Sequence, residues 1–178
     1  MEENTEDLKK YFNPEEYITK IIGVDSGEEE VAEAAEPITE EKINNLIALL
    51  ADNPDYKIKE QALLTLKKEK GEELLLVAIA SDNAKEKRHR LVAACWESEI
   101  NLSKYLPFFV LLALDADYLV SLEAITVIST MEGPFDKKHL EDALVKVKNA
   151  KQTIASERVV LLNDLIVTIE DMIRNQEV

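Results

Sequence analysis

The most chemically distinctive run of this sequence is KEKRHR, which occupies residues 85–90. It places four basic side chains and one histidine within six positions of a chain whose formal net charge is −15. Clustered cations of this kind can contact a small anion or an acidic peptide, and a nearby Trp can serve as an interface anchor. The alternative is structural: the cations pair with Glu86 and neighbouring carboxylates, and the Trp packs between helical repeats. The candidate residues for contact with a partner protein are Lys85, Lys87, Arg88, His89, Arg90 and Trp96.

Residue types that serve catalysis or metal binding are sparse. His89 and His139 are 50 positions apart, and Cys95 has no second Cys, so neither spacing is typical of a zinc site. Cys95 lies in the apolar stretch LVAACW, which favours a core position over a nucleophilic role. The four glycines form no phosphate-binding loop. We therefore expect no catalytic residue, no metal and no cofactor, in a protein that is not an enzyme.

The charge is unevenly spread along the chain. Residues 1–41 carry 14 acidic and 3 basic side chains, or −11, and residues 42–178 carry 22 acidic and 18 basic, or −4. Neither part offers the broadly basic surface that neutralises phosphates, so no nucleic-acid partner is expected. The longest apolar run, LPFFVLLAL at 106–114, has nine residues, fewer than the about 20 that a membrane span needs. An acidic start and a single Cys favour a cytoplasmic protein without a signal peptide.

The composition and periodicity predict an all-α protein. Gly (four) and Pro (five) are too scarce for the many tight turns of a β-sandwich or barrel. Residues 1–37 are predicted to form an acidic arm, in which FNPEEY at 12–17 starts a short helix over 14–22 and residues 25–37 form an acidic linker. Residues 38–178 are predicted to form a single domain of four helix–turn–helix repeats. Their helices are expected near 39–50 and 55–70, 72–80 and 84–96, 103–114 and 117–131, and 137–149 and 152–174.

One phrase recurs in the second helices of this domain. DYKIKEQALLTL at 55–66 matches DYLVSLEAITVI at 117–128, and a period of 31 residues relates the first helices of the first three repeats. The Asp of the phrase can cap a helix, and its Ala lets paired helices approach closely. In the second repeat this period would put His89 and Glu97 at apolar positions, so the pattern predicts a register slip of one or two residues. The matched residues are Asp55, Ile58 and Ala62 with Asp117, Val120 and Ala124.

These features resemble the HEAT-like repeat proteins, in particular the short bacterial type with units of about thirty residues. The likeness covers about residues 38–174 and rests on the two copies of Asp-x-x-aliphatic-x-x-x-Ala. The sequence departs from the family, whose classical units have about 40–47 residues and often a basic residue after the aliphatic, where this chain has Lys59 once and Ser121 later. A tetratricopeptide array is less consistent, because its 34-residue signature is absent. The resemblance implies an ARM-type α-solenoid whose second helices line a concave, protein-binding face, and it supplies no catalytic residues.

The resulting functional prediction is a non-enzymatic scaffold that binds a partner protein. The alternative is an accessory or lyase-like HEAT-repeat protein that handles a small molecule or chromophore. The apolar helix at 157–173 either caps the array or forms a homo-oligomer contact. The acidic residues 25–36 are hypothesised to lie over the basic run at 85–90; otherwise the arm is a solvating tether.

Overall fold

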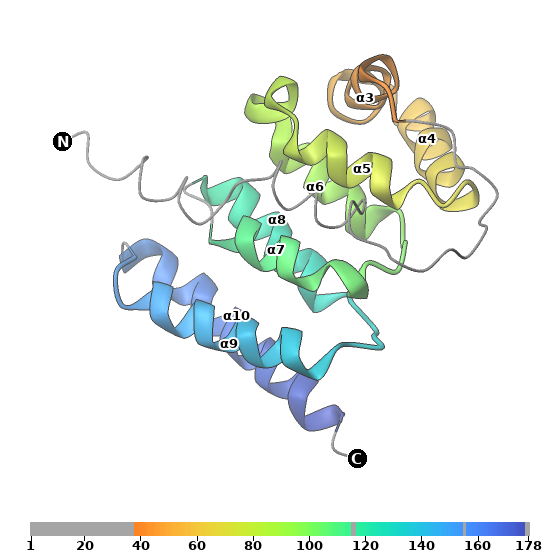
Figure 1. Cartoon of the computed structure of the whole chain (residues 1–178). Coiled ribbons are helices and arrows are strands. Elements are labelled where there is room, and N and C mark those ends of the chain that lie inside the picture. Colours follow the sequence, from red (N-terminus) through yellow and green to blue (C-terminus); the bar gives the residue numbers. More distant parts are fainter. Residues whose placement is uncertain (1–37, 115–116, 155, 177–178) are drawn as a thin grey trace. The chain divides into compact units, whose positions relative to one another are not determined.

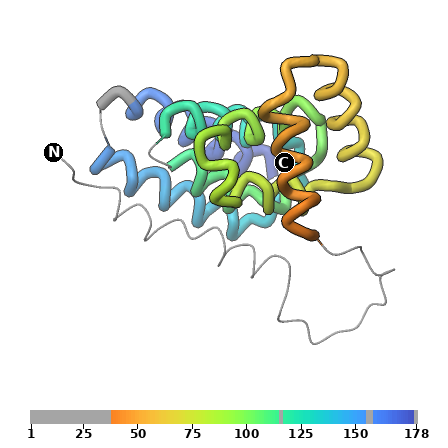
Figure 2. The backbone as a smooth tube through the Cα atoms, turned by 90° about the horizontal axis from the view of Figure 1, so that it is seen from above, coloured from red at the N-terminus to blue at the C-terminus, as the bar shows by residue number. Residues whose placement is uncertain are grey.

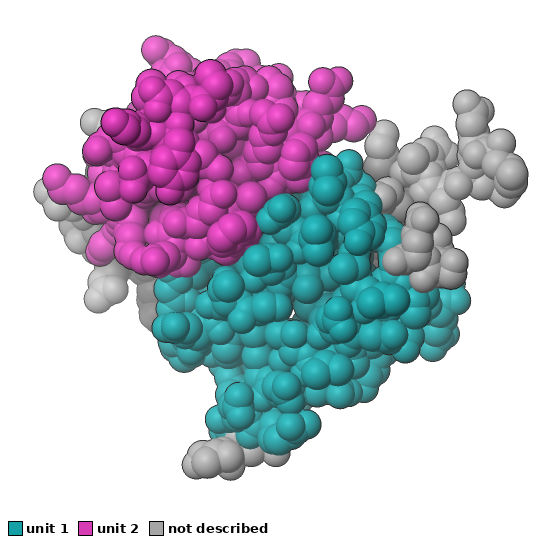
Figure 3. Space-filling model, turned by 180° about the vertical axis from the view of Figure 1, so that it is seen from behind, with its two compact units in different colours: residues 1–12, 101–178 teal, residues 13–100 magenta. Residues whose placement is uncertain are grey.

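The computed structural model describes residues 38–114, 117–154 and 156–176, and these residues contain helices but no β-strand. The all-α prediction is confirmed for this part of the chain. The acidic arm, residues 1–37, with its predicted helix over 14–22, lies outside the described residues. The chain divides into two compact units; of the described residues, 101–114, 117–154 and 156–176 belong to unit 1 and 38–100 to unit 2 (Figure 3). The residues predicted as one repeat domain therefore belong to both units.

In unit 2 the described residues form two helical hairpins. Helix α3 of the first hairpin packs on helix α5 of the second hairpin. The π-helical turn η1, which follows α3, contacts both α4 and α6. Figure 2 follows the chain from α3 through this turn into α4. The elements of this unit are α3 (Glu40–Ile47), η1 (Ala48–Asp52), α4 (Tyr56–Lys68), α5 (Glu72–Ala80), the 3₁₀ segment η2 (Asp82–Lys87) and α6 (Arg88–Glu97).

Side-chain caps explain where the helices of the first hairpin begin. Thr39 Oγ1 accepts a hydrogen bond from the Lys42 amide at 3.3 Å, and Asp55 Oδ1 accepts one from the Lys57 amide at 2.9 Å. Each cap satisfies a backbone donor that the first turn of a helix leaves without an intrahelical acceptor. The capping role predicted for Asp55 is confirmed.

The buried stripe of α6 shows the predicted register slip. An unbroken period of 31 residues would make His89 and Ala93 the counterparts of the buried residues Val120 and Ala124, yet both are only half-buried. The residues that α6 buries lie one or two positions further along the helix. They are Leu91, Val92, Ala94 and Cys95.

In unit 1 the described residues also form two hairpins, drawn in green and blue in Figure 1. α7 packs on α8 within its hairpin and on α9 of the next, and α10 packs on α9 and on α8. Gln176 Nε2, after the end of α10, donates to the Phe135 carbonyl just before α9 at 2.9 Å, so this pair is antiparallel. The elements are the 3₁₀ turn η3 (Ser103–Tyr105), α7 (Leu106–Ala113), α8 (Tyr118–Ser129), α9 (Lys137–Lys151) and α10 (Ser156–Asn175).

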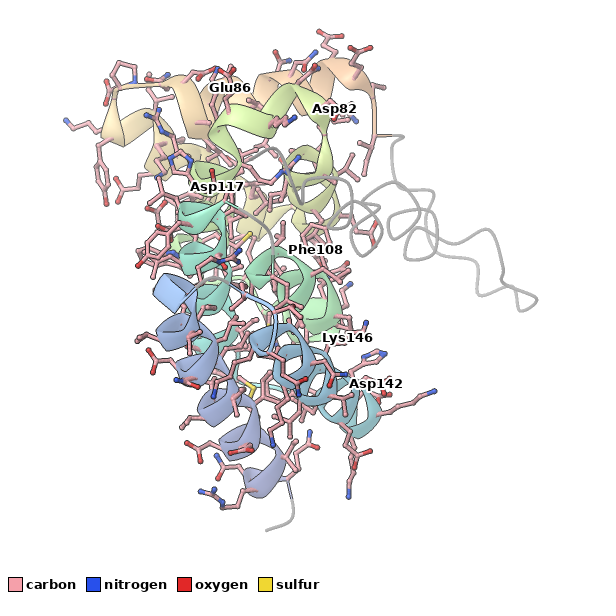
Figure 4. All side chains as sticks on the ribbon, turned by 90° about the vertical axis from the view of Figure 1, so that its left-hand side faces the viewer. Asp82, Glu86, Phe108, Asp117, Asp142 and Lys146 are labelled. Carbon is pink, nitrogen blue, oxygen red and sulfur yellow. The ribbon has the colours of Figure 1, made fainter. Side chains whose placement is uncertain are left out.

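Aspartates begin two helices of unit 1, and the sequence analysis predicts the first of these caps. Asp117 Oδ1 accepts from the Val120 amide at 3.0 Å at the start of α8, where Figure 4 labels it. Asp136 Oδ1 accepts from the His139 amide at 3.2 Å at the start of α9. These caps fix the helix starts from local sequence alone.

The two copies of the repeated phrase are buried to different extents. In α8, Val120 is 3% exposed and Ala124 is fully buried. In α4, Ile58 is 42% exposed and Ala62 is only half-buried. The prediction that Ala62 is buried between paired helices is therefore wrong, because α4 has less helix surface packed against it than α8.

The hairpins recur at a nearly regular spacing. Their first helices begin at residues 40, 72, 106 and 137, so the successive starts are 32, 34 and 31 residues apart. Within each unit the first helix of one hairpin packs on the first helix of the other. This is the local arrangement by which stacked helical repeats cover apolar surface that one hairpin cannot bury alone.

Candidate functional site

The basic run at 85–90 lies where η2 ends and α6 begins. Lys85 and Arg90 are exposed, whereas Lys87, Arg88 and His89 are half-buried. Carboxylates accompany these cations, since Asp82 and Glu86 lie on the same segment (Figure 4). The run is therefore a mixed-charge surface with a basic excess.

Two of its cations are bound to the end of η1. Arg90 Nη1 donates to the Ala51 carbonyl at 2.6 Å, and the Lys87 ammonium lies 2.7 Å from Asp52 Oδ1. The last carbonyls of a helix have no intrahelical donor and carry the negative end of its dipole, so cations are favourable there. These contacts join the second hairpin of unit 2 to the first.

A third cation of the run binds a carbonyl at the end of α5. Arg88 Nε donates to the carbonyl of Ile79, the penultimate residue of that helix, at 2.8 Å. The contacts of Lys87, Arg88 and Arg90 support the structural interpretation of the run. The sequence suggested Glu86 as an acidic partner within it, but the carboxylate found is Asp52, 35 positions before Lys87. No local sequence signal could have identified that pair.

Trp96 lies on α6 with 39% of its surface exposed. It is seven positions after His89, two helical turns further along, so both side chains lie on one side of the helix. Three aromatic residues that follow it in the sequence differ from it in burial. Tyr105 is 2% exposed, and the Phe108 and Phe109 rings are fully buried with their centroids 5.4 Å apart at 90°.

The single thiol is inert in its surroundings. Cys95 is 1% exposed, and its Sγ lies 3.6 Å from the Leu91 carbonyl. Burial raises the pKa of the Cys95 thiol far above its ordinary value, because the thiolate would be desolvated. Cys95 is therefore protonated at neutral pH and is a core residue of α6. Within the described ranges, no group of His, Cys, Asp and Glu side chains is arranged to hold a metal ion.

Sequence reasoning missed a buried polar cluster in unit 1. Arg158 of α10 is 7% exposed, and its Nη2 donates to Ser121 Oγ at 2.8 Å and to the Ala113 carbonyl at 3.2 Å. The Ser121 hydroxyl also donates to the Ala113 carbonyl. Ala113 ends α7, so this cluster satisfies a helix-terminal carbonyl inside the protein. A signal in the sequence is that Ser121 is a polar residue within the largely apolar stretch DYLVSLEAITVI.

The lysines of α4 were also missed as a group. Lys59 Nζ lies 2.6 Å from Glu97 Oε2, and Lys67 Nζ lies 2.9 Å from Glu99 Oε2. The Lys67 ammonium lowers the pKa of the Glu99 carboxyl, by hydrogen bonding first and by its charge second. These pairs connect α4 to the end of α6 and its following turn.

The C-terminal helix buries one stripe and exposes a mixed face. Leu162, Leu165 and Ile169 are fully buried where α10 packs on its neighbours. Val160 and Val167, seven positions apart, are 64% and 56% exposed. The exposed residues that share this outward face include Asp164 and Asp171. The outward face of α10 therefore carries both apolar and acidic side chains.

Comparison with known protein families finds no match, and neither do comparisons with curated proteins and with solved structures. The described residues define the class as an all-helical protein with stacked helical hairpins in each of two compact units. The likeness to HEAT-like repeats rests on the repeated residues alone. None of the helices in the described ranges has the length and apolar character needed to cross a membrane.

Proposed function

We propose that this protein is a non-enzymatic scaffold that binds a partner protein through a solenoid of HEAT-like helical repeats. The observation that carries the proposal is the stacking of first helix on first helix within each unit, at starts 31 to 34 residues apart. Arrays of this kind bury a continuous core between neighbouring repeats and present the side chains of successive helices to a partner. The proposed setting is the cytoplasm, where a single buried thiol is stable in its reduced form.

The proposed contact lies on α6 and the end of η2. Trp96 supplies a half-exposed aromatic anchor, and Lys85 and Arg90 supply exposed positive charge. The contacts of Lys87 with Asp52 and of Arg88 with the Ile79 carbonyl position this surface. A guanidinium has five N–H donors, so a bond from Arg90 to Ala51 leaves donors for an acidic partner. The contact set is Lys85, Lys87, Arg88, His89, Arg90 and Trp96.

Affinity capture with the full chain tests the proposal. The variant Lys85→Glu/Trp96→Ala changes an exposed cation and the aromatic anchor, and it leaves the contacts of Lys87, Arg88 and Arg90 in place. We expect it to lose a partner that the native protein retains, with a decrease in affinity of about 30-fold or more once the partner is purified, because hot-spot residues contribute about 2 kcal/mol or more. Lys146→Glu on α9 makes the same charge change at another exposed lysine and is the matched control. Equal retention by all three proteins would contradict the proposed contact.

A further inference from the structure

α4 is the least buried helix of unit 2. Only Leu66 is buried among its 13 residues, whereas α5 buries five of nine. Two of its large side chains are strongly exposed, Tyr56 at 74% and Leu64 at 57%. A helix that keeps this much apolar surface in water is a candidate for a further contact.

Four exposed residues form one stripe along α4. Lys57, Gln61, Leu64 and Lys68 are spaced by four, three and four positions, which places them on one face of a helix. Tyr56 lies beside the first of them. We call these five residues the α4 outer stripe.

The lysines of the α4 outer stripe differ from Lys59 and Lys67 of the same helix in their ion pairing. Lys59 and Lys67 pair with glutamates at the end of α6. Lys57 and Lys68 form no ion pair or hydrogen bond through their side chains with any residue in the described ranges. Residues 56–70 contain five lysines and two glutamates, a net charge of +3 in an acidic protein. The stripe therefore offers positive charge that no described residue pairs, beside the side chains of Tyr56 and Leu64.

The same chain contains a segment of complementary charge. Residues 25–36 carry six acidic side chains and no basic ones. They lie outside the described residues and end two positions before Ile38, which leads into α3 of the hairpin that contains α4. Twelve residues can span up to roughly 40 Å when extended. Because the tether is short, the effective concentration of this segment near α4 is high.

We propose that residues 25–36 dock on the α4 outer stripe. The basic run at 85–90 fits this segment less well, because three of its cations already have acceptors. Lys87 pairs with Asp52, and Arg88 and Arg90 donate to helix-terminal carbonyls. The equally basic helix α9 also fits less well. There Asp142, labelled with Lys146 in Figure 4, lies between Lys138 and Lys146 at four-residue spacing, in line with the lysines, and it repels an acidic segment. On α4 the exposed Glu60 lies at the edge of the outer stripe, three positions after Lys57. The docking surface is separate from the proposed partner contact, so the inference does not rest on the proposed function.

Paramagnetic relaxation in the full chain tests the docking. A spin label is attached through Ala32→Cys, and Cys95 stays unlabelled because it is 1% exposed. We expect the label to broaden the amide signals of α4, and this broadening should be at least about twofold greater at 0.01 M than at 1 M salt. The reason is that the Debye length is about 30 Å at 0.01 M salt and about 3 Å at 1 M salt, so high salt screens the attraction. Lys57→Glu/Lys68→Glu should remove the broadening. Lys138→Glu/Lys146→Glu on α9, an equal charge change, should leave it intact.

Three results would overturn the inference. They are broadening centred on residues 85–90, broadening of α4 that survives Lys57→Glu/Lys68→Glu, and broadening that does not change with salt. All four lysines are exposed, so both double variants should fold, and an unchanged helical circular dichroism spectrum verifies this. Lys57→Gln/Lys68→Gln removes the two charges without reversing them, and it should also weaken the broadening of the α4 amides.

Discussion

Arg90 Nη1 lies 2.6 Å from the carbonyl oxygen of Ala51 and donates a hydrogen bond to it, which joins α6 to the π-helical turn at the end of α3. The contact gives one residue of the basic run at 85–90 a structural role. A side chain that sequence alone offers as a partner contact also closes a helix end within unit 2. Structural and binding roles for this cluster are compatible, and they can be separated by stability measurements.

The first prediction concerns this bond. Arg90→Ala should lower the free energy of unfolding by about 1–2 kcal/mol, because hydrogen bonds to charged groups contribute about 1.5–3 kcal/mol and Arg90 is partly solvated. Urea unfolding followed by circular dichroism measures the change. Lys85→Ala, at an exposed lysine of the same run, is the control and should stay within about 0.5 kcal/mol of the native protein. Equal midpoints for the two variants would show that the Arg90 bond contributes nothing.

The second prediction concerns the buried cluster of unit 1. Arg158→Ala removes a guanidinium that is 7% exposed and leaves the Ala113 carbonyl and Ser121 hydroxyl without this donor. The loss of packing and of these bonds should cost roughly 2–4 kcal/mol. Arg174→Ala on the same helix breaks only an exposed pair with Asp171 and should cost less than about 1 kcal/mol. A loss for Arg158→Ala no larger than that of Arg174→Ala in urea unfolding would contradict the prediction.

Local features of the fold were predictable from the sequence. Asp55, Asp117 and Asp136 cap the helices that follow them, because an N-cap bond joins residues two or three positions apart. The register slip in α6 was also predictable, since His89 cannot take an apolar core position without cost. The caps follow from residues within a few positions of the helix start, and the slip follows from comparing α6 with the 31-residue period.

Long-range contacts were not predictable in this way. The bond from Arg90 to Ala51 spans 39 positions, and the bond from Arg158 to Ser121 spans 37. Both depend on how hairpins stack, which residue types alone do not specify. The different burial of Ala62 and Ala124 has the same origin: their local sequences match, but more helix surface packs on α8 than on α4.

The third prediction uses that difference. Ala124→Leu should destabilise the protein by about 1–3 kcal/mol, because it adds bulk where the side chain is fully buried. Ala62→Leu should cost less than half as much, since Ala62 is half-buried and a larger side chain can extend toward solvent. Thermal and urea unfolding of both variants measure the two costs. If Ala62→Leu were as destabilising as Ala124→Leu, α4 would be packed more tightly than its exposure indicates.

The fourth prediction concerns the pH dependence of the pair between Lys67 and Glu99. Lys67 lowers the pKa of Glu99 below its ordinary value of 4.5. A carboxyl group whose pKa is lower in the folded than in the unfolded protein contributes stability above the unfolded pKa, and that contribution is lost as the pH falls through the folded pKa. The pair should therefore stabilise unit 2 at neutral pH and stop doing so in acid.

Lys67→Met tests this directly, because it removes the charge and the hydrogen bond but retains an apolar side chain of similar length. Carboxyl NMR titration should show the Glu99 pKa rising toward 4.5 in the variant. High salt should produce part of the same rise in the native protein, since the pair is exposed and therefore screened. Lys68→Met removes the neighbouring lysine, which makes no ion pair with a described residue, and should leave the Glu99 pKa unchanged. A Glu99 pKa that is the same in the native protein and in Lys67→Met would show that the contact is not formed in solution.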